Sequence, residues 1–308
     1  MAMMRAEEVD FLPRTPILMQ YAAEFIGRNY GEFASDYNIL VEANLACARH
    51  FGIDQVSCIS DPYRETQGFG SEIEYVTDGP PRSTHPLENA KDFSILEHPD
   101  PRTSERMLDR VKAVEKYKQR CSGVYSILGW IEGPAAEAAD LRGVTNFLMD
   151  LMDDSEFACQ LMDRCVELGI DFARAQIEAG CDTVGIGDAI ASQVDPATYE
   201  SLIQPREKQL VEAIQEMGAY AKLHICGNIT HLLPGIARLG VDILDADHMV
   251  DLHKVRQIVG DQVVLTGNLD PVAVVKNGTP LDIRKAVLAA HSEARDPYMV
   301  NAGCEIPS

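Results

Sequence analysis

Short apolar runs alternate with longer segments of helical periodicity along most of the chain. Most of the intervals between the runs have helical periodicity, which is clearest over Ser155–Ala179, Pro196–Met217 and Asp282–Arg295. Nearly continuous apolar strands joined through helices are typical of a parallel sheet covered by helices. The runs with the length and composition of buried strands are residues 15–20, 55–60, 124–132, 183–188, 220–226, 242–247, 263–268 and 298–304. This pattern predicts an α/β protein whose residues 1–308 form a single (β/α)8 TIM barrel domain.

Two segments depart from this regular alternation. Glu72–His85 alternates like a strand and then turns at "DGPP", which predicts an excursion between the second and third strands. The sequence ends at Ser308, so we expect a barrel without the helix that would follow its last strand. We therefore expect apolar surface beside residues 298–302 to lie open unless the N-terminal segment or a neighbouring chain covers it. We also expect Cys304 to be the least secure residue of any site it joins.

Charge and composition exclude several classes of partner. The chain has 48 acidic and 27 basic residues, a formal net charge of −21, so nucleic acid and anionic membrane surfaces would be repelled. No apolar run approaches the ~20 residues that cross a bilayer, and the N-terminus has no signal-peptide pattern. The eight scattered cysteines indicate a reducing compartment, so we expect a cytoplasmic protein. Association into a homo-oligomer stays open.

Polar side chains gather at the ends of the predicted strands. A TIM barrel carries its active site at the carboxyl ends of its strands, so these positions are candidates for chemistry. Asp188, Asp247 and Asn268 are candidate catalytic residues, because each could orient a metal-ligating histidine or contact substrate. Each could also be an ordinary cap or turn residue.

Two further motifs follow predicted strands. Asp61, Tyr63 and Arg64 form a polar cluster where a substrate anion could bind, although the start of a helix would have a similar composition. Gly185 and Gly187 form a Gly-x-Gly pair without a third glycine or a following helix start of the dinucleotide type. The glycine pair therefore does not indicate a nicotinamide site.

A candidate metal site lies in the run "KLHICGNITH". His224 and Cys226 point to the same side of a strand, because residues i and i+2 share a face. Cys304 is the other thiol that ends a predicted strand before a polar turn, in "GCEIP". Two thiolates and an imidazole suit zinc and leave a fourth position open, as in catalytic sites. The alternative is that these cysteines pack as small hydrophobic residues.

Three segments, "HICGNITHLLPGIARLGVDIL", "TGNLDP" and "NAGCEIP", carry a family likeness. They resemble the uroporphyrinogen decarboxylase superfamily, and within it the zinc-dependent corrinoid methyltransferases of the methylcobamide:coenzyme M type. The likeness extends to "LGWIEGPAAEAADLRG", "AGCDTVGIGDAIAS" and "VDPATYESLIQP", and so to most of the chain. The resemblance implies a zinc site formed by His224, Cys226 and Cys304.

The resemblance also implies a reaction and its partners. The chain would move a methyl group between methylcobalamin, carried by a corrinoid protein, and a small acceptor such as coenzyme M or tetrahydrofolate. The decarboxylase branch of the family instead has an arginine-bearing "MRQAGR"-type segment that binds substrate carboxylates. Gln20 stands here where its first arginine would fall, so Gln20 is a candidate substrate-binding residue. Porphyrinogen decarboxylation and a non-catalytic module that binds a corrinoid protein are the alternatives.

Overall fold

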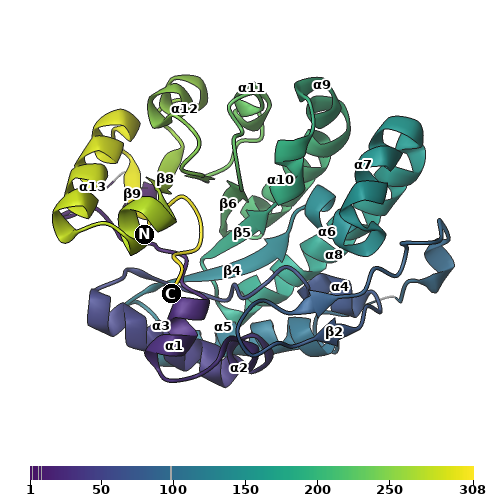
Figure 1. The fold of residues 1–308 in the computed structure, drawn as a ribbon, viewed down its shortest axis with the longest axis horizontal. Helices are drawn as coiled ribbons and strands as arrows, with labels where there is room; N and C mark the ends of the chain where they lie inside the picture. Colours follow the sequence, from purple (N-terminus) through teal and green to yellow (C-terminus); the bar gives the residue numbers. More distant parts are fainter. Residues whose placement is uncertain (2, 6, 8, 98) are drawn as a thin grey trace.

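A curled parallel sheet surrounded by helices forms the centre of the computed structural model, which describes all residues except 2, 6, 8 and 98 (Figure 1). Seven strands lie in the order β1-β4-β5-β6-β7-β8-β9, and every neighbouring pair is parallel. Their bounds are β1 Gln55–Ser57, β4 Ser126–Glu132, β5 Thr183–Gly187, β6 Tyr220–Ile225, β7 Ile243–Ala246, β8 Val264–Leu269 and β9 Tyr298–Ala302. The α/β barrel prediction is confirmed as a TIM-barrel-like fold.

The helices pack around this sheet and bury a continuous apolar core against it. In the described chain, none of them is both long and apolar enough to cross a membrane. The α-helices are α1 Gln20–Phe25, α2 Tyr30–Ser35, α3 Tyr37–Phe51, α4 Arg64–Gly68, α5 Glu105–Cys121, α6 Pro134–Arg142, α7 Val144–Asp153, α8 Ser155–Ala179, α9 Pro196–Thr198, α10 Gln204–Glu216, α11 Leu233–Ile236, α12 Leu252–Val259 and α13 Pro280–Ala294. Short 3-10 or π turns are η1 Met3–Arg5, η2 Phe93–Ile95, η3 Ala189–Gln193, η4 Tyr199–Ile203 and η5 Pro271–Lys276.

The local signals that predicted the longer elements are visible in the structure. α8 spans the predicted residues; the Asp154 carboxylate caps its start by accepting from the Phe157 N–H, and Gly180 ends it in the left-handed conformation. The predicted helix from Pro196 to Met217 consists of α9, η4 and α10 in succession. The predicted excursion is also confirmed, because β2 Ile73–Glu74 and β3 Arg82–Ser83 form an antiparallel pair outside the barrel.

The first predicted strand, residues 15–20, was wrong. Pro16 has no N–H to donate to a neighbouring strand, and α1 already begins at Gln20. The segment nevertheless lies between β9 and β1, because the Thr15 N–H donates to the Val300 carbonyl and the Asp54 N–H donates to the Arg14 carbonyl. An extended segment with few backbone hydrogen bonds thus takes the place of an eighth strand.

The last strand is largely covered, as expected for the case in which another segment packs against it. Tyr298 and Ala302 are only 0% and 3% exposed, while Val300 is half-buried and borders an apolar surface pocket of about 650 Å³. At the amino-terminal ends of the strands, Met3 packs against Ile243, Val264 and Met299. The N-terminal segment therefore covers part of this strand, as one form of the prediction proposed.

Candidate metal centre

Strand register brings chemically active side chains into one row at the carboxyl end of the sheet. Glu132 of β4 lies beside Gly187 of β5, Gly187 lies beside His224 of β6, and His224 lies beside Asp245 of β7. Parallel strands keep such neighbours level with one another across the sheet. The row therefore joins the histidine of the predicted metal site to two carboxylates and a glycine.

The structure brings the three predicted metal ligands together. His224 Nε2 lies 3.2 Å from Cys226 Sγ, and Cys226 Sγ lies 3.9 Å from Cys304 Sγ. The ligand atoms of the three residues all lie within 4.8 Å of one another, although Cys304 is 78 residues away from Cys226 in sequence. In the part of the chain that the structure describes, no fourth histidine, cysteine or carboxylate joins this cluster.

Asp245 orients His224 from the neighbouring strand. His224 Nδ1 lies 3.2 Å from the Asp245 main-chain oxygen and 3.8 Å from its carboxylate, which leaves Nε2 facing the two thiols. Asp245 is itself held by the Lys222 ammonium at 2.7 Å and accepts from the Asn301 side-chain amide. Outer partners of this kind fix the orientation of a ligating histidine. None of these three supporting residues was predicted from the sequence.

The loop that carries Cys304 is held against the first helix and against the end of β7. A Cβ at Gly303 would lie 2.2 Å from the His248 main-chain nitrogen, so only glycine permits this close approach. The next carboxylate, Glu305, accepts from the Gln20 N–H at 2.9 Å, at the start of α1. The side chain of Gln20, predicted to bind substrate, instead donates to Glu24 on the same helix.

The two thiols have different proton affinities. The Cys226 thiol is close enough to donate to Cys304, and this hydrogen bond together with His224 lowers the pKa of Cys304 to about 4. The same interaction, with burial, raises the pKa of Cys226 above its ordinary value. Thiolates are the form in which cysteines bind metals, so the lowered pKa of Cys304 favours metal binding at this residue.

The three predicted catalytic residues lie near the centre, but among the described hydrogen bonds none of their side chains contacts the His224 imidazole, and only the Asp188 N–H reaches His224, at its main-chain oxygen. Asp247 accepts from the Gly227 N–H at 2.9 Å and thereby positions the turn that follows Cys226. Asn268 donates to the main-chain oxygens of Asp247 and Val250, so it fixes the loop after β7. Asp188 accepts from the Ala135 and Ala136 N–H groups at the start of α6.

A pocket of about 160 Å³ opens beside the three candidate ligands. The Trp130 ring forms part of its wall, with its centroid 6.4 Å from that of His224. A Cβ at Gly185 would lie 2.3 Å from Trp130 Cε3, and one at Gly187 would lie 2.9 Å from its Cζ2. The Gly-x-Gly pair of the sequence therefore makes room for the indole. Other lining residues include Asp61, Glu132 and Glu305.

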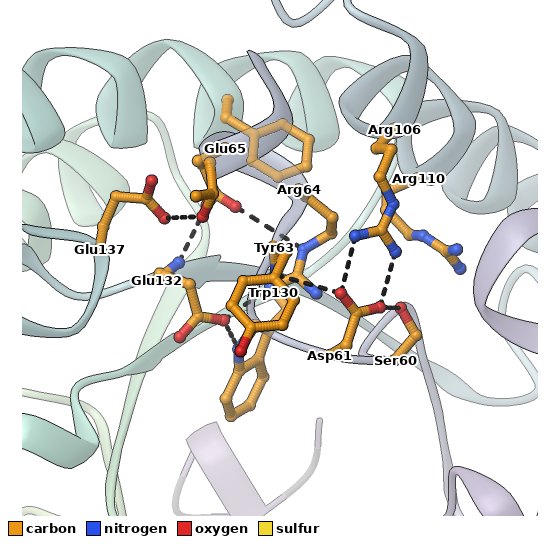
Figure 2. A network of polar contacts seen from close by, with 12 residues as sticks. Ser60, Asp61, Tyr63, Arg64, Glu65, Arg106, Arg110, Trp130, Glu132 and Glu137 are labelled. Carbon is orange, nitrogen blue, oxygen red and sulfur yellow. Dashed lines mark hydrogen bonds and ion pairs between the residues drawn. The ribbon is translucent and has the colours of Figure 1, made fainter. Parts of the chain in front are cut away.

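Buried ion pairs support the wall of this pocket (Figure 2). Asp61 receives two hydrogen bonds of 2.7 Å from Arg106, and Arg64 donates to Glu132 at 2.6 Å. Burial opposes ionisation of Asp61, but the Arg106 guanidinium outweighs it and lowers the pKa of Asp61. Of the cluster predicted to bind an anion, Asp61 lines the pocket whereas Tyr63 and the fully buried Arg64 do not.

Fold and site together define an α/β barrel with a candidate metal centre at the carboxyl ends of its strands. The sequence profile described as uroporphyrinogen decarboxylase (URO-D) matches residues 1–308, and the chain belongs to this family. It is 31% identical over 250 residues to the methylcobamide:CoM methyltransferase MtbA of Methanosarcina mazei, covering 79% of this chain and 73% of the relative.

Other relatives carry a different name in the same family. The chain is 26% identical over 288 residues to the uroporphyrinogen decarboxylase of Microcystis aeruginosa, covering 87% of this chain and 81% of that protein. Among solved structures, a methyltransferase from Methanosarcina mazei superposes with a TM-score of 0.84 at 23% identity. That superposition covers 99% of this chain and 91% of the other and supports the same fold.

Proposed function

We propose that this chain is a zinc-dependent methyltransferase that moves a methyl group between the methylcobamide of a corrinoid protein and a small acceptor such as coenzyme M or tetrahydrofolate. The observation that carries the proposal is the convergence of His224, Cys226 and Cys304 beside an open pocket. The archaeal relative that is 31% identical to this chain is named for transfer from methylcobamide to CoM.

The spacing of the three side chains fits zinc. Zinc–sulfur bonds of about 2.3 Å at tetrahedral angles place two sulfurs roughly 3.8 Å apart, and the observed separation of Cys226 and Cys304 is 3.9 Å. An imidazole and two thiolates are a borderline-soft donor set, which suits zinc better than magnesium or calcium. Three protein ligands would leave one coordination position open for a substrate atom, and all three residues line the pocket.

The residues of the chain have separate parts in this reaction. Bound zinc would supply positive charge that stabilises an acceptor thiol in its thiolate form near neutral pH. The negative charges of Cys226 and Cys304 moderate that charge, so the acceptor sulfur stays nucleophilic. The sulfur–methyl bond forms as the cobalt–methyl bond breaks, the electron pair stays on cobalt, and the thiol proton passes to solvent. Asp245 keeps His224 oriented throughout.

The pocket gives less support to the decarboxylase alternative. A porphyrinogen with many carboxylates requires clustered free cations, whereas the buried Arg64 and Arg106 are already paired with carboxylates. Gln20, at the position of the first arginine of that branch, uses its side chain within α1. A non-catalytic binding module would not require three convergent metal ligands beside a pocket.

The proposal is tested by metal content and turnover. We expect protein purified without chelator to hold about one zinc per chain and to consume methylcobalamin in the presence of a thiol or tetrahydrofolate, followed by cobalamin absorbance. The methylated acceptor is identified by mass spectrometry. Protein that binds no transition metal even on reconstitution, or that transfers no methyl group to any acceptor, would contradict the proposal.

A further inference from the structure

Two of the eight cysteines of the chain lie side by side at the metal centre. Cys226 Sγ is 3.9 Å from Cys304 Sγ, and among the described hydrogen bonds this is the only contact between two cysteine sulfurs. A disulfide has a sulfur–sulfur bond of about 2.05 Å, so these sulfurs would have to approach by about 1.9 Å to form one. A small local movement therefore suffices to join them.

Both cysteines lie just beyond the strands that position them. β6 ends at Ile225 and β9 ends at Ala302, so neither sulfur is carried by the paired part of the sheet. Both residues are half-buried and line the pocket of about 160 Å³. A water-sized molecule needs only ~10–15 Å³ of such volume. A small oxidant such as hydrogen peroxide can therefore reach both sulfurs.

The other six cysteines are less suited to this chemistry. Cys159 is half-buried on α8, outside the cluster at the metal centre. The remaining five are buried, which are Cys47, Cys58, Cys121, Cys165 and Cys181. Accessible thiols are oxidised in preference to buried ones, and a neighbouring thiol converts the first product into a disulfide. The metal centre is therefore the place in this chain where oxidation can end in a disulfide.

We propose that Cys226 and Cys304 form a reversible disulfide when the protein meets a peroxide, and that this bond inactivates the metal centre by removing two of its three ligands. His224 would remain as a single ligand, whereas catalytic zinc sites keep three protein ligands. The inference goes beyond methyl transfer. Its second half, the release of zinc, rests on the zinc site of the proposed function.

The oxidation is balanced by the peroxide. One cysteine thiolate attacks a peroxide oxygen, the oxygen–oxygen bond breaks, and a hydroxide ion leaves as a sulfenic acid forms. The second thiolate then attacks that sulfur, the sulfur–oxygen bond breaks, and a second hydroxide ion leaves as the disulfide forms. The two sulfurs lose two electrons in total, and the peroxide gains them.

Peptide mapping of the oxidised protein tests the proposal directly. Zinc-loaded full-length protein is treated with hydrogen peroxide, its free thiols are blocked, and an unreduced digest is analysed by mass spectrometry. We expect peptides joined through Cys226 and Cys304, loss of two of the eight free thiols, and release of about one zinc per chain to a chromophoric chelator. Dithiothreitol followed by zinc should restore both the thiols and the bound metal.

Variants distinguish the disulfide from general oxidation. In Cys304→Ser the Cys226 sulfur has no partner, so peroxide should convert it to a sulfinic acid that dithiothreitol does not reduce. Cys159→Ala is the matched control, because Cys159 is also half-buried but lies outside the cluster. It should form the disulfide and recover as the wild type does. The peptide map of the wild type identifies the bond by itself, so misfolding of a variant does not obscure the result.

The outcomes separate this inference from the proposed function. Zinc release without a bond between Cys226 and Cys304, zinc that stays bound to the disulfide form, or full recovery of oxidised Cys304→Ser would overturn the inference and leave the methyltransferase intact. A disulfide that forms in protein unable to bind zinc would support the pairing of the thiols and contradict the proposed zinc site. A disulfide that forms with zinc release and reverses with dithiothreitol and zinc would support both.

Discussion

Asp245 faces His224 from the adjacent strand, with its carboxylate 3.8 Å from Nδ1 and its main-chain oxygen 3.2 Å from the same atom. The carboxylate also forms a 2.7 Å ion pair with Lys222, and both side chains are almost completely buried. One aspartate therefore has two separate tasks, which are to orient a candidate metal ligand and to neutralise a buried ammonium. Substitutions can separate them.

The first prediction separates stability from metal affinity at Asp245. Asp245→Asn should lower the free energy of unfolding by ~3–5 kcal/mol, because Lys222 would be left as a buried unpaired charge. It should also weaken zinc binding by ~10–100-fold through the loss of support for His224. Adding Lys222→Met should restore most of the stability and none of the zinc affinity. Denaturant unfolding and competition with a chromophoric chelator measure the two effects.

Joint recovery of both properties in the double variant would contradict this division of tasks. So would an Asp245→Asn protein that retains the zinc affinity of the wild type. In either case the contact between Asp245 and His224 would be incidental to metal binding.

The second prediction concerns the thiol ligands. Cys226→Ala should lose bound zinc and reduce the rate of methyl transfer by more than ~100-fold. Loss of even an outer partner of a metal ligand typically lowers metal affinity or activity by ~10–100-fold, and Cys226 is a candidate ligand itself. Its thermal unfolding temperature should stay close to that of the wild type, because we expect the zinc ion to contribute to the reaction more than to folding. Cys159→Ala is the control, because Cys159 is a half-buried thiol outside the cluster. Loss of zinc in both variants, or an active Cys226→Ala protein, would contradict the ligand assignment.

The third prediction uses the single tryptophan of the chain as a probe of the pocket wall. In Gly185→Ala the new methyl group would lie 2.3 Å from Trp130 Cε3, so the indole must move. We expect a shift in fluorescence emission and a loss of ~1–3 kcal/mol of stability from overpacking. Ala221→Gly on the neighbouring strand should destabilise without shifting the emission. An unchanged spectrum in Gly185→Ala would show that the ring does not occupy this position.

Most strands and helices could be predicted from the sequence because their hydrophobic patterns are long and are supported by local signals such as helix caps. α8 has helical periodicity over Ser155–Ala179, a capping aspartate and a terminal glycine, and its bounds were predicted as the structure has them. The segment 15–20 was mispredicted because its apolar composition resembles a strand. Pro16 was a local signal against this strand, because proline has no N–H to donate. The backbone hydrogen bonds that the segment does make depend on where β9 and β1 lie, which is a property of the tertiary structure.

The three candidate ligands could be predicted from the sequence, but the residues that support them could not, with one exception. Cys304 was predicted from its place at the end of a strand and from the resemblance. His224 and Cys226 share a strand face, so their proximity follows from the sequence alone. The pairing of His224 with Asp245 depends on the register between β6 and β7, which has no local signal. Lys222 was a usable signal, because a lysine inside an apolar strand requires a buried partner.

The fourth prediction concerns the dependence of stability on pH. Burial raises the pKa of Asp188 to about 7, and Glu207 is the neighbouring carboxyl group that interacts with it. Between pH ~4 and pH 7 the folded protein therefore binds more protons at Asp188 than the unfolded chain, so its stability falls as pH rises, by at most ~1.4 kcal/mol per pH unit. Asp188→Asn cannot ionise and should lack this contribution.

Urea unfolding at several pH values measures this contribution. The free energy of unfolding of Asp188→Asn relative to wild type should increase from pH ~4 to pH 7, because only the wild type loses stability at this residue. Asp10→Asn, which makes the same substitution at an exposed residue, is the matched control. Parallel profiles for Asp188→Asn and wild type would show that folding does not raise the pKa of Asp188.

The last prediction concerns how the third ligand is held. Glu305 follows Cys304 directly, and its carboxylate accepts from the Gln20 N–H at 2.9 Å. The neighbouring Ile306 N–H donates to the Ile17 carbonyl, so the Cys304 loop depends on the segment that takes the place of an eighth strand. Glu305→Ala should therefore weaken zinc binding by ~10-fold, as expected for an outer partner, and should speed zinc release to a chelator. Glu24→Ala removes only a carboxylate that contacts the Gln20 side chain, so its zinc release should match that of the wild type. Equal release rates for Glu305→Ala and wild type would show that Cys304 is positioned without this contact.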